Sequence, residues 1–204
     1  MSRINRRRRT VISAALACAL SPSLLWASQR EETLADNVAS TMRRSVNNVS
    51  PARLVFSTPQ AGRQWLYEMS ARLAKFIPDA RERETILINV QYEAKRAGLD
   101  VQLILGLIEV ESMFRRYAIS GVGARGLMQV MPFWVRHIGT SGHNLFEIRT
   151  NLRYGCTILR YYIDRERGDI TRALARYNGS LGRMTYPNKI YAAMRRNWIY
   201  NGAV

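Results

Sequence analysis

The run from Val101 to Arg115 is apolar on nearly every side of a helix, yet it carries two carboxylates near its end. Asp100 stands directly before the run and can cap its first turn, while Gly98 can end the helix that precedes it. A helix without a polar face is stable where the rest of the chain covers it. The sequence therefore predicts a helix buried inside a domain.

The two carboxylates of this helix, Glu109 and Glu111, occupy different faces, because residues three, four or seven apart share a side of a helix. Glu111 follows Leu107 and Ile108 and lies on the drier line. Burial disfavours a carboxylate anion, so the pKa of Glu111 should be raised, and an acid that keeps its proton near neutral pH can act as a general acid. On an exposed helix Glu111 would instead simply pair with Arg115 one turn on.

Three blocks of residues, which begin near the end of this helix, match a known pattern in order and spacing. The first block is Glu111-Ser112, Phe114, Ala118, Ser120, Gly123-Ala124, Gly126-Leu127-Met128-Gln129 and Met131-Pro132. The other two are Asn151 with Gly155, and Ala173-Leu174-Ala175-Arg176-Tyr177-Asn178-Gly179. Over roughly Glu84 to Trp198 the chain therefore resembles the catalytic domain of the soluble lytic murein transglycosylases.

The chain departs from the pattern of this family at two places. Arg115 and Arg116 stand where the family usually has a small polar residue followed by proline, and Gly179-Ser180 stands where it usually has Ala-Gly. The first departure alters how the chain leaves the helix and adds positive charge near the acid. Neither removes a group that the chemistry needs.

The resemblance implies an all-α, lysozyme-like helical domain, the fold shared by goose-type lysozyme and the lytic transglycosylases. It implies cleavage of the MurNAc-β-1,4-GlcNAc bond of peptidoglycan without water, which gives 1,6-anhydromuramoyl products, with Glu111 as both acid and base. The implied substrate contacts are Ser112, Ser120, Met128, Gln129, Tyr177 and Asn178. From the residues alone, Ser120 could merely open a Gly-rich turn, and Met128 and Tyr177 could be core residues.

A glycosidase usually places two carboxylates beside the bond that it cleaves. Here Glu109 points away from Glu111, and the remaining acids have settings that helix caps or solvated charges explain. A single acid suits a reaction that activates no water, and Glu109→Gln is expected to be nearly silent. Two alternatives stay open: a hydrolytic muramidase of the same fold, and a catalytically idle peptidoglycan-binding or secretion accessory protein.

Helical signals dominate the rest of the chain. Helices are expected over Pro59 to Phe76, from Asp79 to Gly98, from Thr150 or Asn151 to Gly168, from Asp169 to Asn178 and from Pro187 onward. Strand signals are absent apart from short stretches such as Arg53 to Phe56. The expected fold class is therefore all-α, with the helices before residue 84 packed on the buried helix as an N-terminal helical extension.

The first residues have the pattern of a secretory signal peptide. Arg6 to Arg9 precede an apolar run from Val11 to Leu20 that is too short to span a bilayer, and cleavage is expected after Ala27. A lipoprotein anchored at Cys18 is the rival interpretation, and both place the protein in the periplasm. The expected segments are then a signal peptide over 1–27, a flexible stalk over 28–58, the helical extension over 59–83 and the catalytic domain over 84–204.

Composition limits the domain count and the partners. A chain of 204 residues with 47% hydrophobic residues supports one well-buried core. Its 31 Lys and Arg against 15 Asp and Glu favour polyanionic surfaces such as peptidoglycan or nucleic acid. The predicted export argues against nucleic acid. We expect a monomer that acts on peptidoglycan glycan strands and leave open its membership of a cell-envelope or secretion complex.

No metal or organic cofactor is expected. His137, His143 and the thiol of Cys156 form no recognisable ligand set, and no base is evident beside the thiol. Cys156 lies among apolar residues at helical spacing, which predicts a small buried hydrophobe.

Overall fold

The computed structural model describes residues 29–48 and 50–202. The predicted signal peptide and the alternative lipid-attachment site at Cys18 lie outside the described residues. The elements are α1 (Asp36–Val46), α2 (Pro59–Leu73), α3 (Ala80–Arg96), α4 (Val101–Ser112), α5 (Phe133–Ile138), α6 (Ile148–Arg165), α7 (Ile170–Tyr177), α8 (Thr185–Ala193) and the π-helical segment η1 (Met194–Trp198). Within the described residues, β-structure is limited to two isolated bridges that join Arg125 to Ile119 and to Val130.

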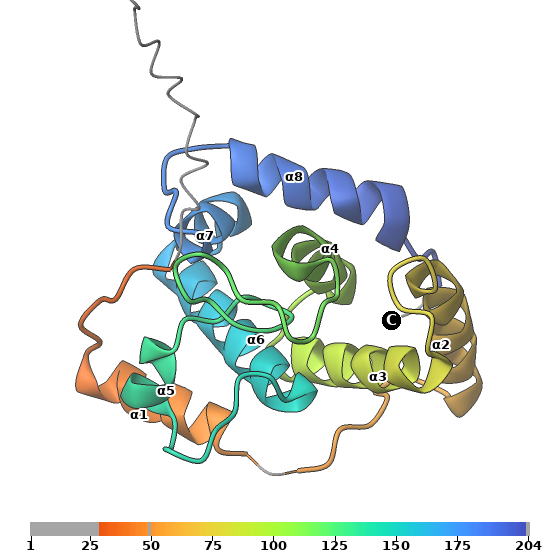
Figure 1. The fold of residues 1–204 in the computed structure, drawn as a ribbon, viewed down its shortest axis with the longest axis horizontal. Helices are drawn as coiled ribbons and strands as arrows, with labels where there is room; N and C mark the ends of the chain where they lie inside the picture. Colours follow the sequence, from red (N-terminus) through yellow and green to blue (C-terminus); the bar gives the residue numbers. More distant parts are fainter. Residues whose placement is uncertain (1–28, 49, 203–204) are drawn as a thin grey trace, which may run out of the picture.

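The predicted buried helix is α4, and it lies at the centre of the molecule with α3, α6, α7 and α8 around it (Figure 1). Leu105, Leu107 and Ile108 have no solvent exposure. Asp100 caps the helix by accepting a hydrogen bond from the N–H of Gln102 at 2.8 Å. The apolar surface of α4 is covered on all sides, as expected for a helix without a polar face.

The C-terminal end of α4 lies earlier than predicted, at Ser112. Met113 and Phe114 then adopt left-handed backbone angles, with φ of 51° and 60°. Such angles cost on the order of 1–3 kcal/mol per non-glycine residue. The cost is offset by burial of the Phe114 ring, whose centroid lies 5.3 Å from that of Phe76 and 5.2 Å from that of Trp198.

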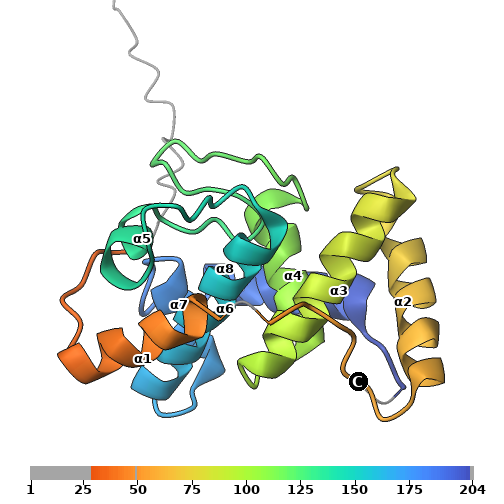
Figure 2. The same cartoon turned by 90° about the horizontal axis from the view of Figure 1, so that it is seen from below.

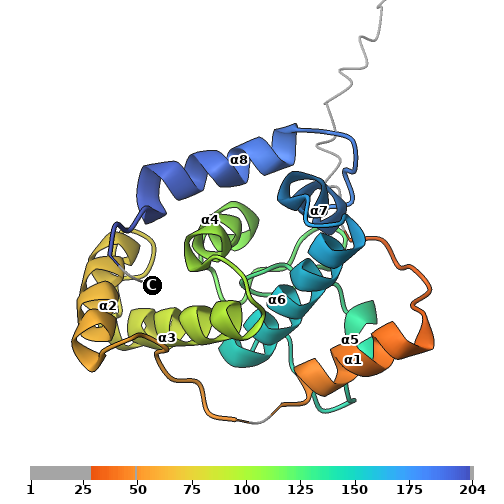
Figure 3. The same ribbon diagram turned by 180° about the vertical axis from the view of Figure 1, so that it is seen from behind.

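Helix α8 and segment η1 lie across α4 and reach from α7 to α2 (Figure 3). The crossing is close because Gly106 has no side chain. A methyl group there would lie 3.0 Å from the carbonyl oxygen of Ile190 and 3.1 Å from the nitrogen of Met194. The C-terminal segment therefore rests directly on the backbone of the central helix.

Helix α1 lies within the segment 28–58, for which a flexible stalk was expected. Its Met42 and Val46 are buried, and Ser45 Oγ lies 3.2 Å from Thr157 Oγ1 on α6. Val38, Met42 and Val46 recur at helical spacing, so this helix has an apolar face that the polar residues between them conceal. Over residues 36–46 the structure thus has a helix that packs on α6. No helix among the described residues is both long and apolar enough to cross a bilayer.

Candidate active site

The carboxyl group of Glu111 lies partly buried at the C-terminal end of α4, and its Oε1 accepts a hydrogen bond from the hydroxyl of Tyr186 on α8. Loss of solvent raises the pKa of Glu111 to about 7, and the hydrogen bond from Tyr186 acts in the opposite direction. Arg115 Nε donates instead to the carbonyl oxygen of Ser112 at 3.1 Å. Glu111 is therefore an acid that exchanges its proton near neutral pH.

Tyr186 was missed by the sequence analysis, although a signal for it exists. It lies four residues before Ile190, so it continues the apolar stripe of the last helix by one turn. The side chain is 7% exposed. Burial and, after it, the negative charge of Glu111 raise the pKa of the Tyr186 phenol well above its usual value. Tyr186 thus stays protonated and remains a hydrogen-bond donor to the acid.

Tyr177 lies in the same region, at the end of α7. Burial, followed by the charge of Glu111, raises its pKa well above the usual value. Its hydroxyl donates to the carbonyl oxygen of Met128 at 2.8 Å, so its structural role is to tie α7 to the loop after α4. Asn178 follows as the C-cap of α7, with its N–H bonded to the carbonyl oxygen of Leu174 at 3.1 Å.

The loop from residue 113 to residue 132 lies beyond the C-terminal end of α4, on the side of α5 (Figure 2), and Asn151 holds its shape. Asn151 was expected to start a helix, but α6 begins at Ile148 and Asn151 lies inside its first turns, buried. Its Nδ2 donates to the carbonyl oxygens of Arg125 and Leu145, both at 2.8 Å, and its Oδ1 accepts from the N–H of Met128 at 2.8 Å. One side chain thus satisfies three backbone groups.

Gly126 fits the same loop tightly against Asn151. Its φ is 74°, and a methyl group at this position would lie 2.3 Å from Asn151 Nδ2 and 2.5 Å from the carbonyl oxygen of Leu145. Both the backbone angle and the contact therefore require glycine.

The two serines of the first block contact the protein itself. Ser112 is 1% exposed, and its Oγ donates to the carbonyl oxygen of Leu127 at 2.8 Å. Ser120 Oγ accepts from the N–H of Ala124 at 3.0 Å and so closes the Gly-rich turn. Their contact with a sugar stays a prediction.

Met128 and Gln129 are also buried within the loop. Met128 packs on Gly155, where a methyl group would lie 2.3 Å from its sulfur. Gln129 has a φ of 48°, and its Nε2 donates to the carbonyl oxygen of Gly126 at 2.9 Å. These side chains shape the backbone beside Glu111, and their direct contact with glycan stays a prediction.

Glu109 has a structural role that the sequence analysis did not foresee. It is 8% exposed and more buried than Glu111, the reverse of the expected order. It accepts hydrogen bonds from Arg196 Nη2 at 2.6 Å, from Asn197 Nδ2 at 2.8 and 2.9 Å, and from Trp198 Nε1 at 2.8 Å. A silent Glu109→Gln is therefore no longer expected, because this carboxylate fastens η1 to α4.

The two arginines that depart from the family pattern both donate to backbone carbonyl oxygens. Arg116 Nε donates to the carbonyl oxygen of Phe146 at 2.9 Å, and its guanidinium lies 5.1 Å from the ring centre of Tyr117.

Cys156, as expected, is a free and fully buried thiol, and burial raises its pKa.

The chain is similar to transglycosylases over its second half. The family model described as "Transglycosylase SLT domain" matches residues 88–198. A transglycosylase of Enterobacteria phage PRD1 is 34% identical over 100 residues, which cover 46% of this chain and 37% of the relative. The membrane-bound lytic murein transglycosylase C of Actinobacillus pleuropneumoniae serotype 5b (strain L20) is 35% identical over 123 residues, or 55% of this chain and 32% of the relative.

This chain therefore spans about a third of the length of these curated relatives. A solved structure, an inactive mutant of the lytic transglycosylase Slt from Pseudomonas aeruginosa, aligns with a TM-score of 0.44 and 24% identity over 77% of this chain and 32% of that one. The helical architecture and the family match agree with the lysozyme-like, all-α domain that the sequence predicted. On the match over residues 88–198, the chain belongs to the transglycosylase SLT domain family.

Proposed function

We propose that this protein is a peptidoglycan lytic transglycosylase that cleaves the MurNAc-β-1,4-GlcNAc bond and releases 1,6-anhydromuramoyl products. The observation that carries the proposal is the state of Glu111: burial raises its pKa to about 7 while one of its oxygens accepts a hydrogen bond from Tyr186. A group with a pKa near the working pH can both give and take a proton in one catalytic cycle.

In the first step, protonated Glu111 donates its proton to the glycosidic oxygen, and the bond to the muramoyl C1 breaks. The N-acetyl group of the substrate stabilises the positive charge that develops there. In the second step, the Glu111 carboxylate takes the proton of the muramoyl C6 hydroxyl, whose oxygen bonds to C1 and closes the 1,6-anhydro ring. Glu111 is then protonated again, as it was before the first step, and no water is consumed.

Tyr186 supports both steps by holding the acid. Its hydroxyl donates to Oε1 of Glu111, which leaves Oε2 for the substrate and stabilises the carboxylate that exists between the two steps. Tyr186 itself keeps its proton because burial and the neighbouring carboxylate raise its pKa. We assign it as a positioning residue of the acid.

The proposal of a single acid is supported by the place of Glu109. This carboxylate is bound by Arg196, Asn197 and Trp198, and none of its contacts involves Glu111 or Tyr186. A hydrolase of the inverting or retaining kind would use a second carboxylate beside the scissile bond. Among the described residues, no Asp or Glu other than Glu111 is hydrogen-bonded to Tyr186. This favours the transglycosylase over the muramidase.

The test is mass spectrometry of the fragments that the purified protein releases from peptidoglycan sacculi in water labelled with ¹⁸O. A lytic transglycosylase gives fragments lighter by one water than the hydrolysis products and free of the label. Labelled, hydrated reducing ends would overturn the proposal in favour of a muramidase, and no release would favour an idle accessory protein. The predicted signal peptide extends the proposal to a periplasmic location.

A further inference from the structure

The side chain of Gln29, at the start of the described residues, is buried in the candidate active site with 5% exposure. Its Nε2 donates to the carbonyl oxygen of Gln129 at 3.5 Å, and its Oε1 accepts from the N–H of Met131 at 3.3 Å. A side-chain hydrogen bond also links it to Tyr177. All three partners belong to the loop and the tyrosine beside Glu111.

The groups around Gln29 form a binding site for an amide. One backbone carbonyl takes the amide N–H and one backbone N–H meets the amide oxygen. An N-acetylated sugar carries the same pair, a donor N–H and an acceptor carbonyl, on its acetamido group. Under the proposed function, on which this inference rests, the Gln29 amide thus occupies a place that suits an acetamido group of the glycan.

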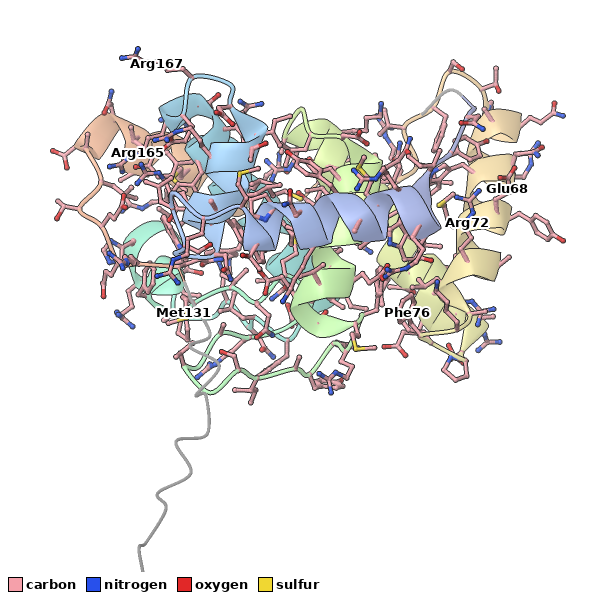
Figure 4. All side chains as sticks on the ribbon, turned by 90° about the horizontal axis from the view of Figure 1, so that it is seen from above. Glu68, Arg72, Phe76, Met131, Arg165 and Arg167 are labelled. Atoms are coloured by element: carbon pink, nitrogen blue, oxygen red, sulfur yellow. The ribbon has the colours of Figure 1, made fainter. Side chains whose placement is uncertain are left out.

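The residues that follow Gln29 fasten the segment on both sides of this site. Glu31 Oε1 lies 2.6 Å from His137 Nε2 on α5. Glu32 pairs with Arg176 on α7 at 3.3 Å and with Arg165 at the end of α6. Met131 and Arg165 lie at the same end of the molecule, opposite the end that carries Glu68 and Arg72 (Figure 4). The segment therefore runs along one end of the domain, from the loop to α6 and α7.

We propose that residues 29–34 are a self-ligand of the active site, in which Gln29 fills the acetamido position until an N-acetylated glycan displaces it. The contacts of Gln29 and Glu31 suit an occupant that leaves readily, while Glu32 keeps the segment attached nearby. The two hydrogen bonds of Gln29 are long, and the side chain of Glu31 is 52% exposed, so its ion pairs contribute little. A site that is free only part of the time binds its ligand with an affinity reduced by the free fraction.

The first test measures binding of the hexamer of N-acetylglucosamine to the purified chain by isothermal titration calorimetry. Gln29→Ala should lower the Kd of this oligosaccharide by about three- to tenfold, since the site is then always free. The matched control is Arg30→Ala, because Arg30 is the exposed neighbour in the same segment. It should leave the Kd unchanged.

A second variant acts on the segment without touching the amide site. Glu32→Gln weakens the attachment of the segment to Arg165 and Arg176. It should also lower the Kd of the oligosaccharide, but by a smaller factor than Gln29→Ala does. The melting temperature of each variant shows whether its fold is intact. In the NMR spectrum, saturating oligosaccharide should move the side-chain amide resonances of Gln29 to the positions of an exposed glutamine.

Equal Kd values for the parent chain and Gln29→Ala, including no binding by either, would overturn the proposal. A weaker affinity of Gln29→Ala would also overturn it, because Gln29 would then help to bind the sugar. These results are independent of the proposed reaction, since binding needs no bond cleavage. If Gln29→Ala binds the oligosaccharide more tightly but the protein releases no anhydro products, the self-ligand proposal stands and the proposed lytic function is wrong.

Discussion

The hydroxyl of Tyr186 donates a hydrogen bond to Oε1 of Glu111 although 75 positions of sequence separate them. The contact exists because α8 crosses α4 closely at Gly106 and so brings its first turn to the last turn of the central helix. Glu111 and Tyr186 thus come from two helices that pack closely at Gly106.

Replacement of the acid should abolish turnover without unfolding the protein. Glu111→Gln keeps the shape of the side chain but can neither donate nor accept a proton in the required way, so the rate should fall by at least about 10²- to 10⁴-fold. Release of soluble fragments from sacculi measures the rate, and circular dichroism reports the fold. Substantial residual turnover by this variant would remove Glu111 from its assigned role.

Removal of the Tyr186 hydroxyl should shift the pH dependence of the reaction. Tyr186→Phe takes away a hydrogen bond that stabilises the Glu111 carboxylate, so the pKa of Glu111 should rise above about 7, by on the order of one unit. The corresponding limb of the pH–rate profile should move to higher pH. The control is Tyr191→Phe on the same helix, which loses only a contact with Thr171 at 2.9 Å. A profile that moves equally in both variants would contradict the positioning role.

Glu111 should make the protein less stable as the pH rises. Its pKa is about 7 in the folded chain against an ordinary value of 4.5, so the folded state binds this proton more tightly than the unfolded state does. The penalty is absent below about pH 4.5, grows between the two pKa values and is complete above about pH 7. Glu111→Gln should therefore gain stability relative to the parent by up to about 3 kcal/mol at pH 8 compared with pH 4. Urea unfolding at the two pH values measures the difference, which should be near zero if Glu111 is fully hydrated.

Loss of the Glu109 charge should destabilise the C-terminal segment. Glu109→Gln cannot satisfy Arg196, Asn197 and Trp198 together, and the free energy of unfolding should fall by about 1–3 kcal/mol. Glu68→Gln is the matched control, since Glu68 on α2 is far less buried than Glu109, with 34% of its side chain exposed, and pairs with Arg72 at 3.6 Å (Figure 4). It should change the stability by less than about 1 kcal/mol. Equal effects of the two substitutions would contradict the structural role of Glu109.

Two glycines of the loop after α4 should respond differently to alanine. Gly123 has a φ of 87° and no atom within 4 Å of an added methyl group, so Gly123→Ala should cost only the strain of the left-handed backbone, about 1–2 kcal/mol. Gly126→Ala adds a collision with Asn151 to a similar strain and should cost clearly more. It should also weaken glycan binding, because the loop that carries Met128 and Gln129 must shift. Thermal unfolding and oligosaccharide titration of both variants check the order.

Local signals predicted the helices well. Asp79, Asp100 and Asp169 cap helices as their positions indicated, and Gly98 and Gly179 end helices with positive φ. These features depend on the nearest residues of the chain, which is why the sequence alone suffices to predict them.

The errors arose where distant residues decide the outcome. Helix α4 stops at Ser112 because the ring of Phe114 is buried against Phe76 and Trp198, and Glu109 is drier than Glu111 because η1 folds over it. Neither feature can be predicted from the spacing of residues within α4. The same holds for Tyr186, whose partner is known only once the crossing of α4 and α8 is known.

The contact from α8 to α4 also makes the protonation of Glu111 depend on the C-terminal part of the chain. Glu111 precedes Tyr186, whose hydroxyl stabilises the Glu111 carboxylate, by 75 positions of sequence. A nascent or clipped chain that ends before α8 holds Glu111 without the donor that stabilises its anion. The pKa of Glu111, and with it the pH range of the proposed reaction, therefore depends on α8 having docked on α4.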